Sequence, residues 1–303
     1  MDKVLLVGGS GMVGKQLQKK LLARGYTVLI LGRSESKSEN VKSYLWNIAT
    51  KKIDEEAIKS ADYIINLAGA GIADRRWTAS RKKEIVSSRV GATNLLIQTI
   101  IKTKTNPKAF ISASAIGYYG ALKSDKIFTE DDLPSNDFLS HCCQLWEQSS
   151  NKIEDLSIRR VVLRIGVVLS EKGGALSKIK APFRLGLGSA IGSGKQYIPW
   201  VHIDDLCECF IKAIEDPLMK GPYNIVSPNP TPNSEFSAVL AQVLKKPYWL
   251  PNIPERLIQL FMGEMAVIVT KGSRISCNKI LSNGFVFKYP NLKEALKHLL
   301  TSI

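Results

Sequence analysis

Three glycines near the N-terminus have the type and spacing that a phosphate-binding turn requires. They follow the apolar run 4–7 and precede a run in which leucines and lysines recur with helical spacing. One glycine lets the chain bend, a second lets the backbone approach a pyrophosphate, and a third lets the helix pack against the strand. The N–H groups at the helix start favour negative charge. The pattern predicts a dinucleotide site formed by Gly8, Ser10, Gly11, Met12, Val13 and Gly14.

The end of the second predicted strand, residues 26–31, indicates which dinucleotide is bound. NAD enzymes usually place an acidic residue here for the ribose 2′-hydroxyl. This chain has Gly32, Arg33 and Ser34 instead. No carboxylate repels a 2′-phosphate, and Arg33 can bind one through paired N–H donors. The cofactor is therefore predicted to be NADP(H) rather than NAD, the alternative being that Arg33 is simply an exposed loop residue.

Hydroxyl groups follow the predicted strand 109–115, where the nicotinamide would lie. Ser114 and Tyr118 are the candidates for hydrogen bonding to a substrate carbonyl and for donating its proton. Tyr119 is expected to pack structurally. Basic side chains on other loops suit a small anionic substrate, and the predicted substrate residues are Arg75, Arg184 and Lys195.

Composition excludes several classes of protein. The 303 residues are 45% hydrophobic and 23% charged, with a formal net charge of +15. The lysines are scattered and do not alternate with aromatic residues, so nucleic acid is not expected as a partner. The five cysteines lack metal-site spacing, and no metal site is predicted. No run resembles a membrane span or a signal peptide, so we expect a cytoplasmic protein without a membrane partner, as a monomer or homodimer.

The elements that position these residues alternate between strands and helices, which predicts an α/β Rossmann-type doubly wound parallel sheet. We expect an NADP-binding domain over 1–170 that also receives segments near 198–226. Residues 171–303 are expected to form mainly a small α/β substrate-capping domain with a terminal helical part over 233–303. Residues 35–42 suggest a polar loop, 160–169 one strand, and 254–271 one helix.

Longer motifs resemble a known family. The glycine motif, 66–69, 112–120 and 201–206 are similar to the extended short-chain dehydrogenase/reductase superfamily. The stretches 72–77, 182–188 and 191–196 resemble one NAD-dependent epimerase/dehydratase-like branch, whose members carry a small C-terminal domain of unknown function. The resemblance covers essentially the whole chain. It implies further cofactor contacts at Gly32, Leu67, Ala68, Gly69, Glu84, Arg89 and Val168.

The chain departs from that superfamily at its catalytic Tyr-x-x-x-Lys pair. Aligned through Glu147, the pair falls on Leu139 and Cys143, which can supply neither the tyrosine proton nor the lysine cation. One hypothesis is an NADP-dependent epimerase or oxidoreductase with a rearranged acid/base set. The alternative is a non-catalytic NADP-binding sensor or regulatory protein.

Overall fold

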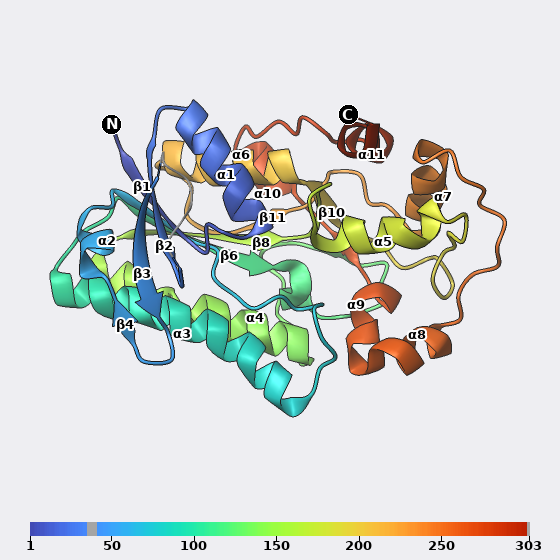
Figure 1. Cartoon of the computed structure of the whole chain (residues 1–303), viewed down its shortest axis with the longest axis horizontal. Coiled ribbons are helices and arrows are strands. Elements are labelled where there is room, and N and C mark those ends of the chain that lie inside the picture. The colour runs from blue at the N-terminus through green and yellow to red at the C-terminus, as the bar shows by residue number, and fades with distance from the viewer. Residues whose placement is uncertain (35–40, 302–303) are drawn as a thin grey trace.

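A parallel sheet forms the centre of the computed structural model, which describes residues 1–34 and 41–301. The eight strands lie in the order β11-β8-β6-β5-β1-β2-β3-β4, and all pair in parallel except β3 with β4 (Figure 1). The strands are β1 Lys3–Val7, β2 Thr27–Gly32, β3 Lys42–Asn47, β4 Lys52–Ile53, β5 Tyr63–Asn66, β6 Ala109–Ala115, β8 Arg159–Ile165 and β11 Gly221–Ile225.

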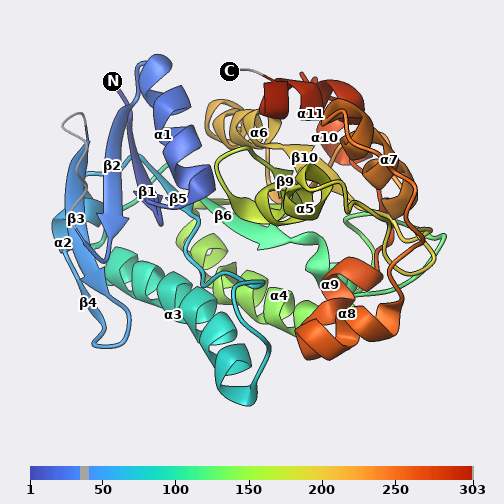
Figure 2. The same ribbon diagram turned by 45° about the vertical axis from the view of Figure 1, so that its right-hand side comes forward.

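Helices cover both faces of this sheet (Figures 1 and 2). One face carries α1 (Met12–Ala23) and α6 (Ile203–Glu215), and the other carries α2 (Glu55–Lys59), α3 (Ala79–Thr103) and α4 (Phe138–Ser149). Strand β1 explains why both faces are covered. Val4 and Leu6 point into one apolar core and Leu5 and Val7 into the other, because successive strand residues face opposite sides. The predicted doubly wound Rossmann-type fold is confirmed.

The remaining elements form the small C-terminal domain and its junction with the sheet. The strands are β9 (Val167–Leu169), paired with β10 (Trp200–His202), and β7 (Ile127–Phe128), paired with β12 (Arg274–Ile275). The helices are α5 (Gly174–Arg184), α7 (Asn233–Val243), α8 (Glu255–Met262), α9 (Val267–Thr270), α10 (Asn278–Ser282) and α11 (Leu292–Thr301), and short 3-10 turns span Ile116–Tyr119, Asn151–Leu156 and Gly263–Ala266. Within the described ranges, no helix has the length and apolar content needed to cross a membrane.

Two predicted elements are wrong because glycines divide them. The strand predicted over 160–169 breaks at Gly166, where a Cβ would lie 2.3 Å from the Pro199 carbonyl oxygen. The helix predicted over 254–271 breaks at Gly263, whose φ of 61° is left-handed and disfavours other residues. Most of the loop predicted over 35–42, and the last two residues of the helical part over 233–303, lie outside the described residues.

Candidate functional site

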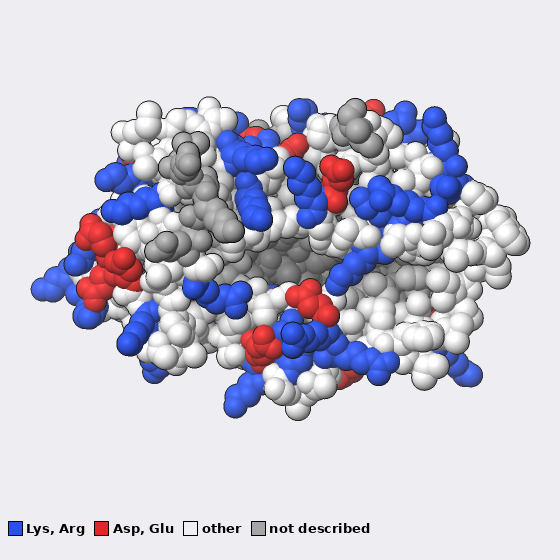
Figure 3. All heavy atoms as spheres, in the orientation of Figure 1, with Lys and Arg blue, Asp and Glu red and all other residues white. Residues whose placement is uncertain are grey.

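The carboxyl ends of the parallel strands meet in a furrow. Strand β1 lies between β2 and β5, so the chain crosses to opposite sides of the sheet at this point. Ligands of open α/β sheets bind where the strand order reverses in this way. Figure 3 shows a hollow across the middle of one face with lysines and arginines on both rims, and the start of α1 and the end of β6 lie beside it in Figure 1.

The glycine turn fits closely between its neighbours. Gly8 has a φ of 82°, and a Cβ on it would lie 3.2 Å from the backbone of Leu67 and Ala68 in the loop after β5. A Cβ on Gly14 would lie 2.5 Å from the carbonyl oxygen of Gly9, so only glycine lets α1 pack this close to the turn. Gly11 has open space instead, its nearest neighbour being the Gly8 carbonyl oxygen at 3.5 Å.

The start of α1 is arranged to receive an anion. Within the described part of the chain, Gly11 caps the helix without a side-chain hydrogen bond, and the first turn holds no acidic residue. The first N–H groups of a helix have no partner inside the helix. Ser10 and Gly11 are exposed, and Met12 and Val13 are half-buried. This end of α1 therefore presents donors and a positive dipole to the furrow.

The loop after β5 is held from beneath by the buried Asn66. Its side chain donates to Thr93 and accepts from the Ala68 N–H. Next in the loop, a Cβ on Gly69 would lie 3.0 Å from the guanidinium carbon of Arg89. These contacts place two predicted ribose residues, Ala68 and Gly69, beside a predicted cofactor arginine.

Arg89 carries a positive charge that no described residue neutralises. Its guanidinium donates to the Ile85 carbonyl and lies over the Trp146 ring, 5.0 Å from the ring centre. Burial lowers the pKa of Arg89, and among the described residues it forms no ion pair with a carboxylate. An incompletely neutralised arginine beside the glycine turn suits an anionic ligand.

The other predicted cofactor residues lie around the same edge. Gly32 ends β2, the neighbour of β1, and Arg33 is exposed directly after it. On β9, the Val168 carbonyl lies beside Gly174, which also approaches the Met12 side chain of α1. Glu84 lies further out and is exposed.

Glu84 is connected to the site through another side chain. It accepts from Arg81 at 2.7 Å, and Arg81 donates in turn to the carbonyl of Gly71 in the loop after β5. Arg81 is buried, and its Nε has no hydrogen-bond partner among the described residues. Glu84 therefore supports this loop from the side of α3.

Ser114 belongs to a buried ion-pair network. Its hydroxyl donates to Glu147 Oε1 at 2.6 Å, and Arg164 grips the same carboxylate with two N–H groups at 2.9 Å each. Paired charged hydrogen bonds of this kind are among the strong ones in proteins. The only proton of the Ser114 hydroxyl is committed to Glu147 in this arrangement. The sequence contained a signal for the network, since Arg164 interrupts an apolar strand.

The two tyrosines after β6 have different surroundings. Tyr119 is buried, donates to Asn224 at 2.8 Å and accepts from Arg164 at 2.9 Å. Burial raises the pKa of Tyr119 to about 12, so it stays neutral, consistent with the packing role expected for it. Tyr118 is half-buried, and its ring lies flat against Arg164, with the guanidinium carbon 3.5 Å from the ring centre. Among the described residues, its hydroxyl makes no hydrogen bond.

Leu139 and Cys143 face the turn after β6 from α4. A Cβ on Gly117 would lie 3.4 Å from Leu139 and 3.6 Å from the Cys143 sulfur. Burial raises the pKa of the Cys143 thiol well above its ordinary value, so the thiol is neutral. These positions thus present an apolar side chain and an uncharged thiol, and supply neither a proton donor nor a cation.

The predicted substrate residues are all exposed but come from separate segments. Arg75 lies in the loop after β5, Arg184 ends α5, and Lys195 lies before β10. No described contact joins them. Arg76, which the sequence reasoning did not select, donates to the carbonyls of Leu260 and Phe261 and so links this loop to α8.

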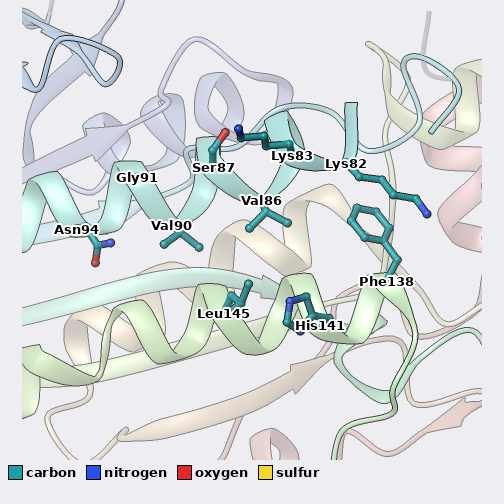
Figure 4. A pocket seen from close by; sticks show the side chains of 10 residues that line it. All are labelled: Lys82, Lys83, Val86, Ser87, Val90, Gly91, Asn94, Phe138, His141 and Leu145. Carbon is teal, nitrogen blue, oxygen red and sulfur yellow. The ribbon is translucent and has the colours of Figure 1, made fainter. Parts of the chain in front are cut away.

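A separate groove lies between α3 and α4 and has a volume of about 480 Å³. Figure 4 shows that side chains of these two helices line it, among them Val86 and Val90 from α3 and Leu145 from α4. None of its lining residues belongs to the strand-end loops, so the groove is distinct from the candidate cofactor site.

No metal site is predicted from the sequence, but the structure brings His202, Asp204 and His298 close enough together that they could hold a metal ion. Both ring nitrogens of His202 already have partners, however. Nδ1 accepts from the Asp204 N–H at 3.0 Å, and Nε2 lies 3.2 Å from His298 Nδ1. Hydrogen bonding alone therefore accounts for this cluster.

Comparisons with known proteins cover the whole chain. Residues 4–226 match the model of the NAD dependent epimerase/dehydratase family, and residues 253–299 match a domain of unknown function. The epimerase family protein YfhF of Bacillus subtilis is 38% identical over 98% of this chain and 97% of its own length.

Solved structures agree with this match. Human epimerase family protein SDR39U1, crystallised with NADPH, superposes with a TM-score of 0.88 at 32% identity, covering 99% of this chain and all of that one. A nucleoside-diphosphate sugar epimerase from Corynebacterium glutamicum has a TM-score of 0.80 at 29% identity over 98% of this chain and 58% of its own. On these grounds, the chain belongs to the NAD dependent epimerase/dehydratase family and carries the C-terminal domain of unknown function.

Proposed function

We propose that the chain binds NADP(H) and uses it as a hydride carrier in an epimerase or oxidoreductase reaction on a small, anionic molecule. The uncapped start of α1, facing the loop after β5, is the observation that carries the proposal. It suits the pyrophosphate, and the exposed Arg33 suits the 2′-phosphate. The NADPH in the crystal structure of SDR39U1 supports the same choice.

The other predicted site residues have the following proposed roles. Leu67, Ala68 and Gly69 lie against the ribose, with Glu84, Arg89 and Val168 completing the cofactor site. Arg75, Arg184 and Lys195 attract the anionic substrate, because all three are exposed cations. When bound, the cofactor would supply hydride in a reduction or accept it in an oxidation, and the chain would supply or accept the accompanying proton.

Tyr118 is the proposed proton donor. Its hydroxyl is free of described partners, and Arg164 fixes the orientation of its ring. Ser114 has a positioning role instead, because its proton is held by Glu147. The proton thus passes from the Tyr118 hydroxyl to the substrate oxygen as hydride reaches the adjacent carbon.

The second candidate is a non-catalytic NADP(H)-binding protein. Leu139 and the neutral thiol of Cys143 favour it, since they occupy the positions of the usual acid/base pair. Both candidate functions require NADP(H) binding, but only the first requires that the protein convert a substrate.

Calorimetry and a turnover assay test the proposal. NADPH should bind more tightly than NADH, and NADPH should be oxidised in the presence of one of a panel of small anionic carbonyl compounds. Equal affinity for the two cofactors would overturn the NADP assignment. Binding without turnover of any panel member would favour the non-catalytic function.

With an active substrate, Tyr118→Phe should lower kcat about a hundredfold or more, because general acid catalysis contributes that much. The matched control is Tyr63→Phe, because Tyr63 is the first residue of β5 and lies at the amino end of the strand, away from the carboxyl ends that form the candidate site. An unchanged kcat for Tyr118→Phe between about pH 6 and 9 would remove this residue from the mechanism.

A further inference from the structure

One end of the molecule exposes large apolar side chains from three neighbouring segments. The segment after α5, the connection between α7 and α8, and α8 itself meet at the right-hand end of Figure 1. Trp249 and Phe261 are 73% and 72% exposed. We define the apolar end as Leu185, Leu187, Trp249, Leu257, Leu260 and Phe261. Apolar patches formed by several neighbouring exposed side chains mark interaction sites in proteins.

Contacts between the segments hold this surface together. Gly186 lies against Pro247, with an added Cβ 3.7 Å from its ring, and Asn252 donates to the Gly192 carbonyl at 3.0 Å. Ile253 donates to the Ala190 carbonyl at 2.8 Å. The segment after α5 therefore lies beside the connection that leads directly into α8.

Helix α8 lies at the surface of the molecule with several of its apolar side chains exposed to solvent. None of its residues is buried, although Leu257, Leu260 and Phe261 follow helical spacing. Its C-terminal carbonyls accept from Arg76, and Glu264 just beyond it pairs with Lys82 at 2.6 Å. These polar contacts anchor the helix together with Met262, which packs against the apolar cluster around Trp77, whereas Leu257, Leu260 and Phe261 remain exposed.

The apolar end is bordered by cations. Lys245, Lys246 and Arg256 are exposed and lie within four residues of its members in sequence, and within the described ranges none of them forms an ion pair. Glu255, the acidic residue of α8, is already paired with Lys123. Figure 3 shows this end with very few acidic side chains and with lysines and arginines around its border.

We propose that the apolar end docks on the surface of an anionic lipid membrane. Trp, Leu and Phe side chains enter the boundary between headgroups and acyl chains, and Lys and Arg side chains bind the lipid phosphates. A second copy of the chain fits the surface poorly. Its own cations would face these three across a symmetric interface, and the whole chain has a net charge of +15.

Vesicle co-sedimentation of the full chain with NADPH tests this. The protein should bind vesicles of equal parts phosphatidylcholine and phosphatidylglycerol and leave pure phosphatidylcholine vesicles unbound. The double variant Leu260→Ser/Phe261→Ser should bind at least about tenfold more weakly, because it lacks two apolar side chains that the membrane would bury. Val286→Ser is the matched control, being 84% exposed between α10 and α11, and should bind like the wild type.

A second pair of variants tests the cations. Lys245→Glu/Lys246→Glu should abolish the preference for anionic vesicles. The matched control is Lys51→Glu/Lys52→Glu in the hairpin formed by β3 and β4, which makes the same change in charge. The backbone is matched as well, because Lys51 and Lys245 both have a left-handed conformation, with φ of 53° and 54°. This control should keep the preference.

Any one of three results would overturn the proposal. The first is that the wild type does not bind anionic vesicles, and the second is that the Leu260→Ser/Phe261→Ser variant binds them as tightly as Val286→Ser does. The third is that light scattering finds the wild type to be a dimer and the Leu260→Ser/Phe261→Ser variant to be a monomer. The last result would assign the apolar end to a second copy of the chain.

Discussion

At the residue scale, Gly11 and Gly14 are identical in type but have different roles. Gly14 is a packing requirement, because its Cβ would collide with the backbone of Gly9 at 2.5 Å. Gly11 has a φ of −70° and room for a side chain, so its role concerns what binds over it. The room for a Cβ atom at each glycine therefore separates a role in packing, at Gly14, from a role in ligand binding, at Gly11.

We predict that Gly11→Val folds normally but loses NADPH binding, because the branched side chain occupies the phosphate position. Gly14→Ala should instead lose about 2 kcal/mol of unfolding free energy, even though alanine in a helix normally gains about 1 kcal/mol over glycine. Urea denaturation and calorimetry measure the two effects. A folded Gly11→Val variant with wild-type affinity would show that the phosphates bind elsewhere.

Arg33 tests cofactor choice at a single side chain. Charged hydrogen bonds contribute about 1.5–3 kcal/mol, so Arg33→Ala should weaken NADPH at least about tenfold. NADH lacks the 2′-phosphate, and its affinity should hardly change. Arg33→Lys should fall in between, since it keeps the charge and loses the paired donors. An equal loss for both cofactors in calorimetry would contradict the assignment.

At the element scale, two arginines on β8 form ion pairs of different burial. Arg164 is 3% exposed and holds Glu147 of α4, whereas the Glu154 partner of Arg160 is 55% exposed. Removing one partner of a buried pair leaves an uncompensated charge, which costs about 3–5 kcal/mol. An exposed pair contributes about 0–1 kcal/mol.

We therefore predict that Arg164→Ala lowers the free energy of unfolding by about 3 kcal/mol or more, and Arg160→Ala by about 1 kcal/mol or less. Urea denaturation of both variants gives the comparison on one strand. Similar losses would show that the network around Ser114 does not hold α4 to the sheet.

The sequence predicted most elements because their patterns are local. Strand β1 appears in the sequence as an unbroken apolar run followed by glycine. The break at Gly166 was missed because its cause, the Pro199 carbonyl, is distant in sequence. Gly263 was visible as a glycine, but only the fold shows that it adopts a left-handed conformation.

At the scale of the whole molecule, the sequence was least informative about which apolar side chains are exposed to solvent. A cofactor site at the carboxyl ends of the strands could be predicted because the glycine turn, Arg33 and the loop after β5 directly follow strands in the sequence. The apolar end could not, since Leu260 and Phe261 have the spacing of a buried helix face. No membrane partner was expected from the sequence, and the docking surface depends on side chains that only the folded chain leaves uncovered.

The C-terminal helix α11 is joined to the sheet domain through histidines. His202, which caps α6, is buried and bonds to the exposed His298 of α11, and the Tyr289 ring stacks 4.0 Å from His202. Burial lowers the pKa of His202, and with the opposing effect of Asp204 and the smaller lowering effects of His298, Lys20 and Lys288 the pKa falls from 6.5 to about 4. The folded chain therefore holds His202 neutral where the unfolded chain binds a proton.

We predict that this histidine makes stability depend on pH. Its contribution is complete above about pH 6.5 and is lost as the pH falls towards about 4, because protons bind preferentially to the unfolded chain. Between pH 7 and 5 the wild type should lose about 2 kcal/mol of unfolding free energy from this group. His202→Asn keeps an oxygen that can cap α6 and removes the titration, so its urea midpoint should vary less over this range. Parallel pH profiles for the two proteins would show that another group governs the junction with α11.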